Sequence, residues 1–141
     1  DPGEPARRHS IGEWIGGASL EYREGSLEVL SEYLPMWHRD RTGDRSYGHR
    51  TGYLQVGHRI GAWTPYTRLD VRSMDRGDPY FAPGGRDLDR WEQMVGVRWD
   101  FTPHSALKLE VGAGKAERRD EGGDVSRDGF VAARLQLSWV F

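Results

Sequence analysis

Apolar and polar residues alternate along most of this chain. The alternation is clearest in residues 129–141, where apolar side chains occupy every second position from Val131 to Phe141. Polar side chains, among them Arg134 and Gln136, lie between them. Because successive side chains of a β-strand point to opposite faces, this period of two predicts a strand with one apolar and one polar face.

The same alternation recurs in seven segments. No stretch shows the 3.6-residue period of an amphipathic helix together with capping residues, so we predict an all-β fold, an antiparallel up-and-down meander. Residues 1–11, which contain Pro2 and Pro5, are expected to be a disordered lead-in, and residues 12–141 one structured segment. The predicted strands span residues 12–23, 26–37, 50–62, 65–75, 90–101, 105–117 and 129–141.

The connections between these strands are alternately short and long. The short ones are Glu24-Gly25, residues 62–65 and residues 102–104. The long ones are charged and rich in Gly and Asp, and they comprise residues 38–49, 76–89 and 118–128. Transmembrane β-barrels sort their connections in this way, with short turns at one rim and longer loops at the other. The sorting therefore favours a partial, open transmembrane barrel.

One predicted face of the strands is uncharged. A Lys or Arg at the bilayer midplane costs about 2–4 kcal/mol, which would explain why this face carries no charged residue. The same face could also pack onto the other half of a soluble core. Its members are Trp14, Ala18, Leu20, Tyr22, Leu27, Val29, Tyr33, Leu54, Val56, Ile60, Ala62, Leu69, Val71, Trp91, Val95, Val97, Trp99, Phe101, Leu107, Leu109, Val111, Ala113 and the apolar residues of 129–141.

The large aromatic residues of this face lie near the strand ends rather than in the middle. Trp91 and the pair Trp99 and Phe101 are separated by smaller valines. At ~3.3 Å per residue and ~40° of tilt they would lie roughly 20–25 Å apart along the membrane normal, as the two aromatic girdles of a barrel do. The predicted girdle residues are Trp14, Tyr33 and Trp91 at one interface, and Tyr22, Trp99, Phe101, Trp139 and Phe141 at the other.

The opposite face carries charges of both signs in equal number. An unpaired buried ion costs several kcal/mol, so these groups must face water or form an ion-paired plug. Small residues such as Gly96 and Gly112 on this face are expected to leave room for water. The candidate pore-lining residues are Glu21, Arg23, Glu28, Glu32, Gln55, Arg59, Arg68, Asp70, Arg72, Glu92, Arg98, Asp100, Lys108, Glu110, Arg134 and Gln136.

Composition argues against several other functions. The chain has no Cys, so it can form neither a disulfide nor a thiolate metal site. A net charge of −2 gives no argument for a nucleic-acid partner. The five His residues show no metal-ligand spacing, and no nucleophile motif joins Ser, His and acidic residues. We therefore expect no enzymatic activity, no metal and no cofactor.

The hairpin over residues 95–110 resembles the carboxy-terminal hairpin of Gram-negative porin-like proteins. In that family a Gly-x-Arg-Tyr-Asp-Phe strand turns through Pro into an Ala-Leu-Lys-x-Glu strand, and here Trp99 takes the Tyr position. The terminal Phe141 is similar to the final aromatic residue that is read during barrel insertion. The resemblance implies a bacterial outer membrane location, contact with its lipid, passive diffusion of small hydrophilic solutes, and contact of the last strand with the barrel-assembly machinery. Homo-oligomerisation stays open.

Strand parity adds one more expectation. If the long connections are extracellular, the first and last predicted strands both run towards the periplasm, whereas bacterial barrels have an even strand number with both ends periplasmic. We therefore expect partner strands from an amino-terminal part of the same barrel. Three alternatives stay open: a non-conducting structural or scaffold barrel, an outer-membrane enzyme whose catalytic residues lie elsewhere, and a soluble ligand-binding β-barrel.

Overall fold

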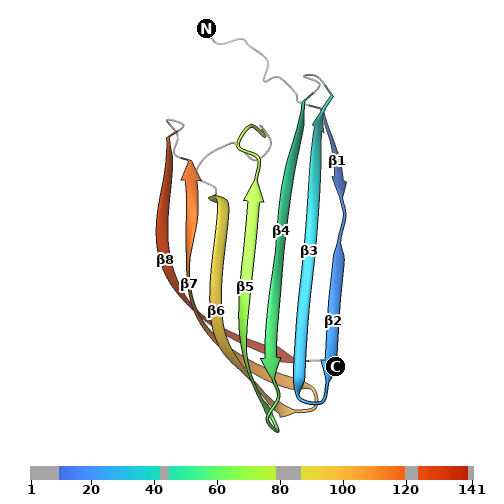
Figure 1. Ribbon diagram of the computed structural model, residues 1–141, viewed down its shortest axis with the longest axis vertical. Helices are drawn as coiled ribbons and strands as arrows, with labels where there is room; N and C mark the ends of the chain where they lie inside the picture. The colour runs from blue at the N-terminus through green and yellow to red at the C-terminus, as the bar shows by residue number, and fades with distance from the viewer. Residues whose placement is uncertain (1–9, 42–44, 79–86, 120–123, 140–141) are drawn as a thin grey trace.

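The computed structural model describes residues 10–41, 45–78, 87–119 and 124–139, and these residues form one antiparallel β-sheet (Figure 1). The described residues contain no helix that is long and apolar enough to cross a membrane. The strands are β1 (Ile11–Ile15), β2 (Ala18–Glu24), β3 (Leu27–Asp40), β4 (Ser46–His58), β5 (Trp63–Met74), β6 (Asp87–Thr102), β7 (Ser105–Arg119) and β8 (Val125–Trp139).

The sheet is an up-and-down meander that does not close. Its order is β1-β3-β4-β5-β6-β7-β8, and β2 also pairs with β3. Among the described residues, β1 and β2 are paired with β3 alone and β8 with β7 alone, so the first and last strands are not joined. The sheet curls, with the lower halves of β6, β7 and β8 bending sideways (Figure 1). The predicted all-β meander and the expected open, curved sheet are both confirmed.

The first predicted strand is split into β1 and β2 by a backbone effect. Both pieces pair with β3, and the break between them lies opposite Leu34 and Pro35. The N–H of Gly16 donates to the carbonyl of Pro35 at 3.0 Å. Proline has no N–H with which to return the second bond of this pair. The ladder therefore lapses over Gly16-Gly17 and resumes at Ala18.

Several strand boundaries differ from the prediction. β3 continues to Asp40 and β4 begins at Ser46, so most of the predicted long connection over residues 38–49 is strand. The predicted turn over residues 62–65 lies earlier, with Gly61 at a φ of 61°, a conformation that favours glycine. The alternation ends before the strands do, because residues 38 and 39, for example, are polar on both faces although they are still paired with β4.

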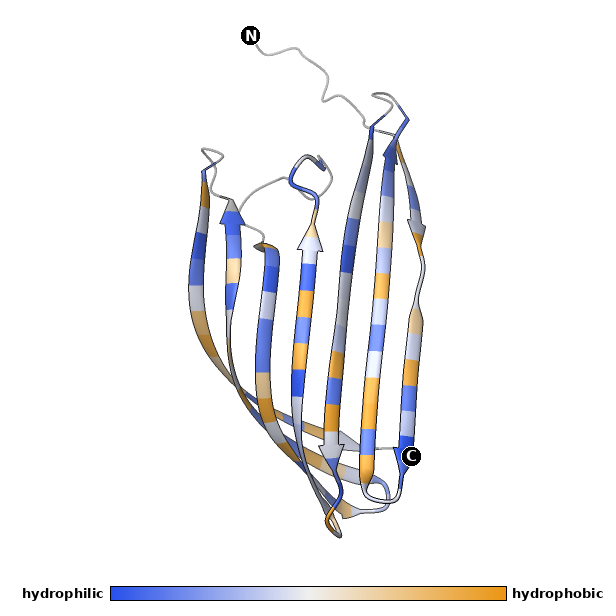
Figure 2. Cartoon of the chain, in the orientation of Figure 1, coloured by the Kyte–Doolittle hydropathy of each residue, from blue (hydrophilic) through white to orange (hydrophobic). Residues whose placement is uncertain are grey.

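The register separates the side chains into two faces. Outward-facing residues pair with outward-facing ones, as Leu54 does with Leu69 and Val95 with Val111. The resulting bands of opposite hydropathy alternate along the strands in Figure 2. Val131 is 85% exposed, whereas most buried side chains among the described residues are polar. The usual arrangement of a soluble protein, with apolar side chains inside, is inverted.

Candidate functional site

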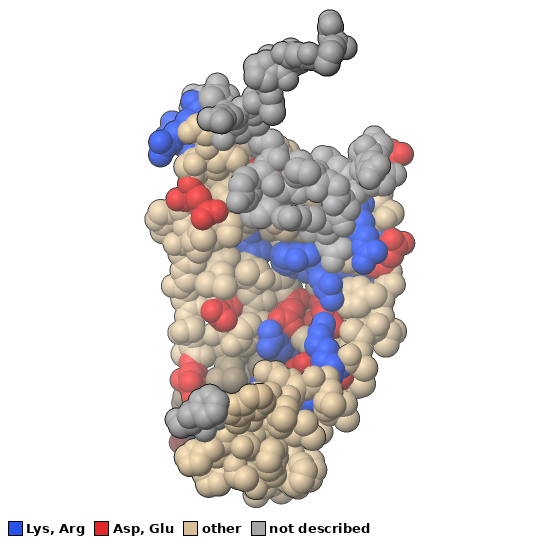
Figure 3. Space-filling view, turned by 180° about the vertical axis from the view of Figure 1, so that it is seen from behind, with Lys and Arg blue, Asp and Glu red and all other residues tan. Residues whose placement is uncertain are grey.

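The polar face of the sheet is concave. Arg98 on β6 reaches Glu28 on β3, with an Nη1 to Oε1 distance of 3.5 Å, although β4 and β5 lie between their strands. Arg134 on β8 reaches over β7 to Glu92 on β6. In a flat sheet these side chains would lie too far apart to make contact, so the two ion pairs show that the sheet is curved. Figure 3 shows the charged side chains gathered in the middle of this face.

Glu92 is the centre of the largest charge cluster. Its side chain is 3% exposed, and both of its oxygens accept hydrogen bonds from Nη2 of Arg134, at 2.8 and 2.7 Å. Nη2 of Arg90 donates to the same carboxylate at 2.9 Å. A buried carboxylate is costly unless it is paired and hydrogen-bonded, and two guanidinium groups meet that requirement.

Further pairs follow the concave face towards the short turns. Nη2 of Arg68 donates to Asp70 at 2.7 Å, and its guanidinium lies 4.0 Å from the ring centroid of Tyr53. Nε of Arg98 donates to Asp100 at 3.0 Å. Arg68, Asp70 and the Glu92 cluster border a hollow of about 350 Å³. Its full lining is Thr51, Arg68, Asp70, Val71, Arg72, Arg90, Glu92, Met94, Glu110 and Arg134.

The small residues of this face do not leave open space, so that expectation is wrong. A Cβ added at Gly96 would lie 2.6 Å from Cζ of Tyr66, because the outer end of the Tyr66 side chain lies over the glycine. The Tyr66 hydroxyl then donates to Glu110 at 2.7 Å. Met94 lies over Gly112 in the same way, at 2.6 Å from an added Cβ. The glycines make room for large side chains rather than for water.

The predicted pore-lining residues lie on the concave side of the strands, with one exception. Arg59 follows β4 in the turn, where its N–H donates to the carbonyl of Ser26 at 2.7 Å. Gln55 is buried, whereas Glu21, Arg23 and Gln136 are exposed towards the open edges of the sheet. Contacts within the concave face join Glu28, Arg68, Asp70, Glu92, Arg98, Asp100, Glu110 and Arg134, while Glu32, Arg72 and Lys108 are partly exposed.

The aromatic residues of the convex face form pairs near the strand ends. Trp14 packs on Trp37 with ring centroids 4.6 Å apart. Trp63 stacks on Trp99 at 5.3 Å and 6°. The prediction did not include Trp37, the last residue of a predicted strand, or Trp63, which lies in a predicted turn. The predicted girdle residues Tyr22, Tyr33, Trp91, Phe101 and Trp139 are also exposed on this face, and Phe141 lies outside the described residues.

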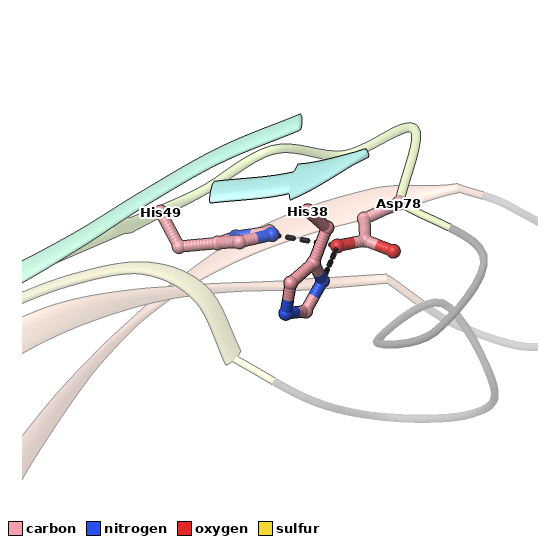
Figure 4. Close-up of side chains that lie close together, drawn as sticks. All are labelled: His38, His49 and Asp78. Atoms are coloured by element: carbon pink, nitrogen blue, oxygen red, sulfur yellow. Dashed lines mark hydrogen bonds and ion pairs between the residues drawn. The ribbon is translucent and has the colours of Figure 1, made fainter. Parts of the chain in front are cut away.

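A second cluster lies nearer the long connections and was not predicted. His38 on β3, His49 on β4 and Asp78 after β5 meet on the concave side, where all three are buried (Figure 4). His38 and His49 share the inward parity of one hairpin, a signal that the sequence contains. The position of Asp78 depends on the path of the connection that follows β5, and no periodicity predicts that path.

No family model, curated protein or solved structure matches this chain. The site chemistry is therefore read from the two faces of the sheet. The described concave face offers fixed, paired charges that can exchange hydrogen bonds with water or a polar solute. The convex face offers mostly apolar side chains, interrupted by the uncharged polar residues Ser31, Thr67 and Gln93. Its apolar side chains are suited to contact with hydrocarbon.

Proposed function

We propose that this chain forms part of a bacterial outer-membrane β-barrel through which small hydrophilic solutes diffuse passively. The observation that carries the proposal is the inverted polarity, with apolar side chains exposed outside and charged side chains enclosed. Leu135 and Leu109, for example, are paired on neighbouring strands and both are exposed. Soluble monomers rarely expose a continuous apolar patch larger than a few hundred Å².

The aromatic residues support the membrane part of the proposal. Trp91 and Trp99 lie on the convex face of β6, which runs unbroken from Asp87 to Thr102. Tyr33 lies in the same row as Trp91, through Gly52 and Val71. Tyr and Trp prefer the two interfaces of a bilayer, where the ring is half apolar and half wet.

The charged hollow supports the pore. Four arginines and three carboxylates line it, so the described lining favours neither anions nor cations strongly. We therefore propose a pore with weak charge selectivity rather than an anion channel. A non-conducting scaffold barrel is the second candidate, because pairs such as Arg98 with Glu28 reach across the concave face and narrow it.

The open edges support a requirement for partner strands. An unpaired backbone N–H or C=O group facing lipid costs several kcal/mol. The outer sides of β2 and β8 have no strand partner among the described residues. We propose that further strands of the same barrel, or copies of it, cover these edges, and that the barrel-assembly machinery engages the last strand.

Single-channel recording combined with cysteine labelling tests the proposal. These 141 residues contain no Cys, so a cysteine introduced here is the only thiol of this segment, and any Cys elsewhere in the full-length protein is first replaced by Ser. Gln136→Cys lies on the concave side, and Leu137→Cys lies next to it on the convex side. A charged, water-soluble thiol reagent should reduce the conductance of the first variant and leave the second unchanged.

The remaining outcomes identify the alternatives. A folded, membrane-inserted protein without conductance supports the scaffold barrel. A protein that stays folded and monomeric without detergent is a soluble β-barrel, and it overturns the membrane assignment altogether.

A further inference from the structure

Three elements bring two imidazoles and one carboxylate together near the upper end of the concave face. His49 pairs with Met36 across the β3–β4 hairpin, which places it diagonally opposite His38. The segment after β5 folds back onto them, with Gly77 close to the ring of Tyr47. Asp78 in this segment is 1% exposed, His38 1% and His49 6%. The cluster is therefore enclosed by the fold and is not a chance meeting of surface side chains.

The polar atoms of the cluster converge on one point (Figure 4). Nδ1 of His38 lies 2.5 Å and Nε2 of His49 lies 2.6 Å from the same Oδ2 of Asp78. The two rings are 5.1 Å apart at 61°, so each nitrogen lone pair can point inward without the rings stacking. One ligand atom from each residue lies within 4.8 Å of the other two.

A cation bound at this point would replace the hydrogen bonds between the two rings and Asp78. An ionised carboxylate only accepts hydrogen bonds, so beside an ionised Asp78 the facing nitrogens of His38 and His49 are the donors. Metal binding displaces such protons, because the ligand is the neutral imidazole lone pair. On the far side of the His38 ring, Nε2 lies 3.0 Å from Oε2 of Glu13. An outer carboxylate of this kind commonly orients a metal-binding histidine and fixes its tautomer.

We propose that His38, His49 and Asp78 bind one divalent transition-metal ion of the zinc class. Two imidazole nitrogens and a carboxylate oxygen suit Zn²⁺, and three protein ligands leave a fourth position for water. The ion would fasten the segment after β5 to the β3–β4 hairpin at the mouth of the concave face. The site is independent of whether the barrel conducts.

Metal binding has a specific structural consequence. The backbone N–H of Asp75 donates to Nδ1 of His49 at 3.2 Å. A neutral imidazole that binds a metal through Nε2 carries its proton on Nδ1, so this nitrogen can no longer accept. The Asp75 amide must then lose its acceptor, and its exchange with solvent deuterium should become faster when Zn²⁺ binds.

Calorimetric titration of the full-length, chelator-treated protein in detergent with Zn²⁺ alone tests the site. The wild type should bind one ion per chain at saturation. Asp78→Asn keeps the side-chain shape and should weaken binding at least tenfold, as should His49→Gln. His104→Ala, which removes an exposed histidine in a turn, is the matched control and should bind like the wild type.

Two further measurements keep the outcome clear. Circular dichroism must show unchanged β-structure in each variant, and if Asp78→Asn misfolds, His49→Gln decides alone. Co²⁺ in place of Zn²⁺ should give the visible absorption of a site with nitrogen ligands, and His38→Ala should abolish it. Absence of saturable Zn²⁺ binding, or equal binding by the wild type and His49→Gln, overturns the proposal. Hydrogen bonds alone would then hold the segment after β5 to the β3–β4 hairpin.

Discussion

Leu135 and Gln136 offer a direct test of which solvent each face of the sheet contacts. They are neighbours on β8, both are exposed, and their side chains point to opposite faces. Leu135 pairs with Leu109 on the convex side, whereas Gln136 pairs with Lys108 on the concave side. We expect Leu135→Arg to impair folding into lipid strongly and Gln136→Arg to impair it weakly.

The expected magnitudes follow from the position of Leu135. It lies four residues from Trp139, which is ~13 Å along the strand. In the proposed barrel, at ~40° of tilt, this is ~10 Å along the membrane normal and would place Leu135 close to the middle of an apolar band ~25 Å tall. Arginine there costs about 2–4 kcal/mol, which lowers the folding equilibrium constant about 30- to 700-fold. Gln136→Arg adds only a like charge opposite Lys108, at a cost of about 0.2–1 kcal/mol.

Urea titration of the full-length protein in lipid vesicles, followed by tryptophan fluorescence, measures both free energies. The wild type, Leu135→Arg and Gln136→Arg are compared at equal lipid concentration, with heat-modifiable gel mobility as a check on folding. In a soluble protein an exposed Leu→Arg change is usually within 0.5 kcal/mol of neutral. Equal stability of the two variants would therefore refute the assignment of the convex face to lipid.

Two further substitutions test the site, and one deletion tests the strand end. Arg134→Leu should destabilise the fold by about 1–2 kcal/mol in the urea titration, because the buried Glu92 keeps only Arg90, and a shift no larger than that of Gln136→Arg would contradict the pairing. Gly96→Ala should cost about 1–3 kcal/mol by displacing the Tyr66 ring, while Gly129→Ala, where an added Cβ meets nothing closer than 3.8 Å, should be neutral in the same assay. Deleting Phe141 should lower the amount of protein assembled in the outer membrane of cells but spare folding in detergent, and normal surface levels of the truncated protein would contradict an insertion signal.

The meander could be predicted from the sequence because each strand alternates between two unlike surroundings. Residues 105–117 were predicted as a strand, and β7 runs from Ser105 to Arg119. The prediction fails where that contrast ends. Where β3 and β4 meet the long connection between them, both faces of the sheet carry polar residues, such as Arg39 on one face and His49 on the other. The backbone pairing nevertheless continues there. The alternation therefore predicts how far the apolar stripe extends along a strand, but it does not predict where the strand ends.

The candidate site was predictable in part for the same reason. Parity placed Glu92 and Arg134 on one face, but only the curvature of the sheet brings them across β7 into contact. The packing of Tyr66 over Gly96 depends on side-chain direction, which strand periodicity does not contain. Asp78 meets His38 and His49 only because the chain folds back after β5, so its role could not be read from spacing.

The directions of the edge strands restrict how the sheet can be completed. Every neighbouring pair is antiparallel, so the β1–β2 leg and β8, which are separated by β3 to β7, run in the same direction. Joining these two edges to each other would make a parallel seam, and so would a ring of identical copies joined head to tail. An all-antiparallel barrel therefore needs an odd number of additional strands between them.

The isolated chain should consequently aggregate or associate edge to edge in detergent. Backbone amides on the free side of β8 should exchange with solvent far faster than those of β5 and β6, which have neighbours on both sides. A monodisperse, heat-modifiable monomer with β8 protected on both sides would show that the edges close on each other.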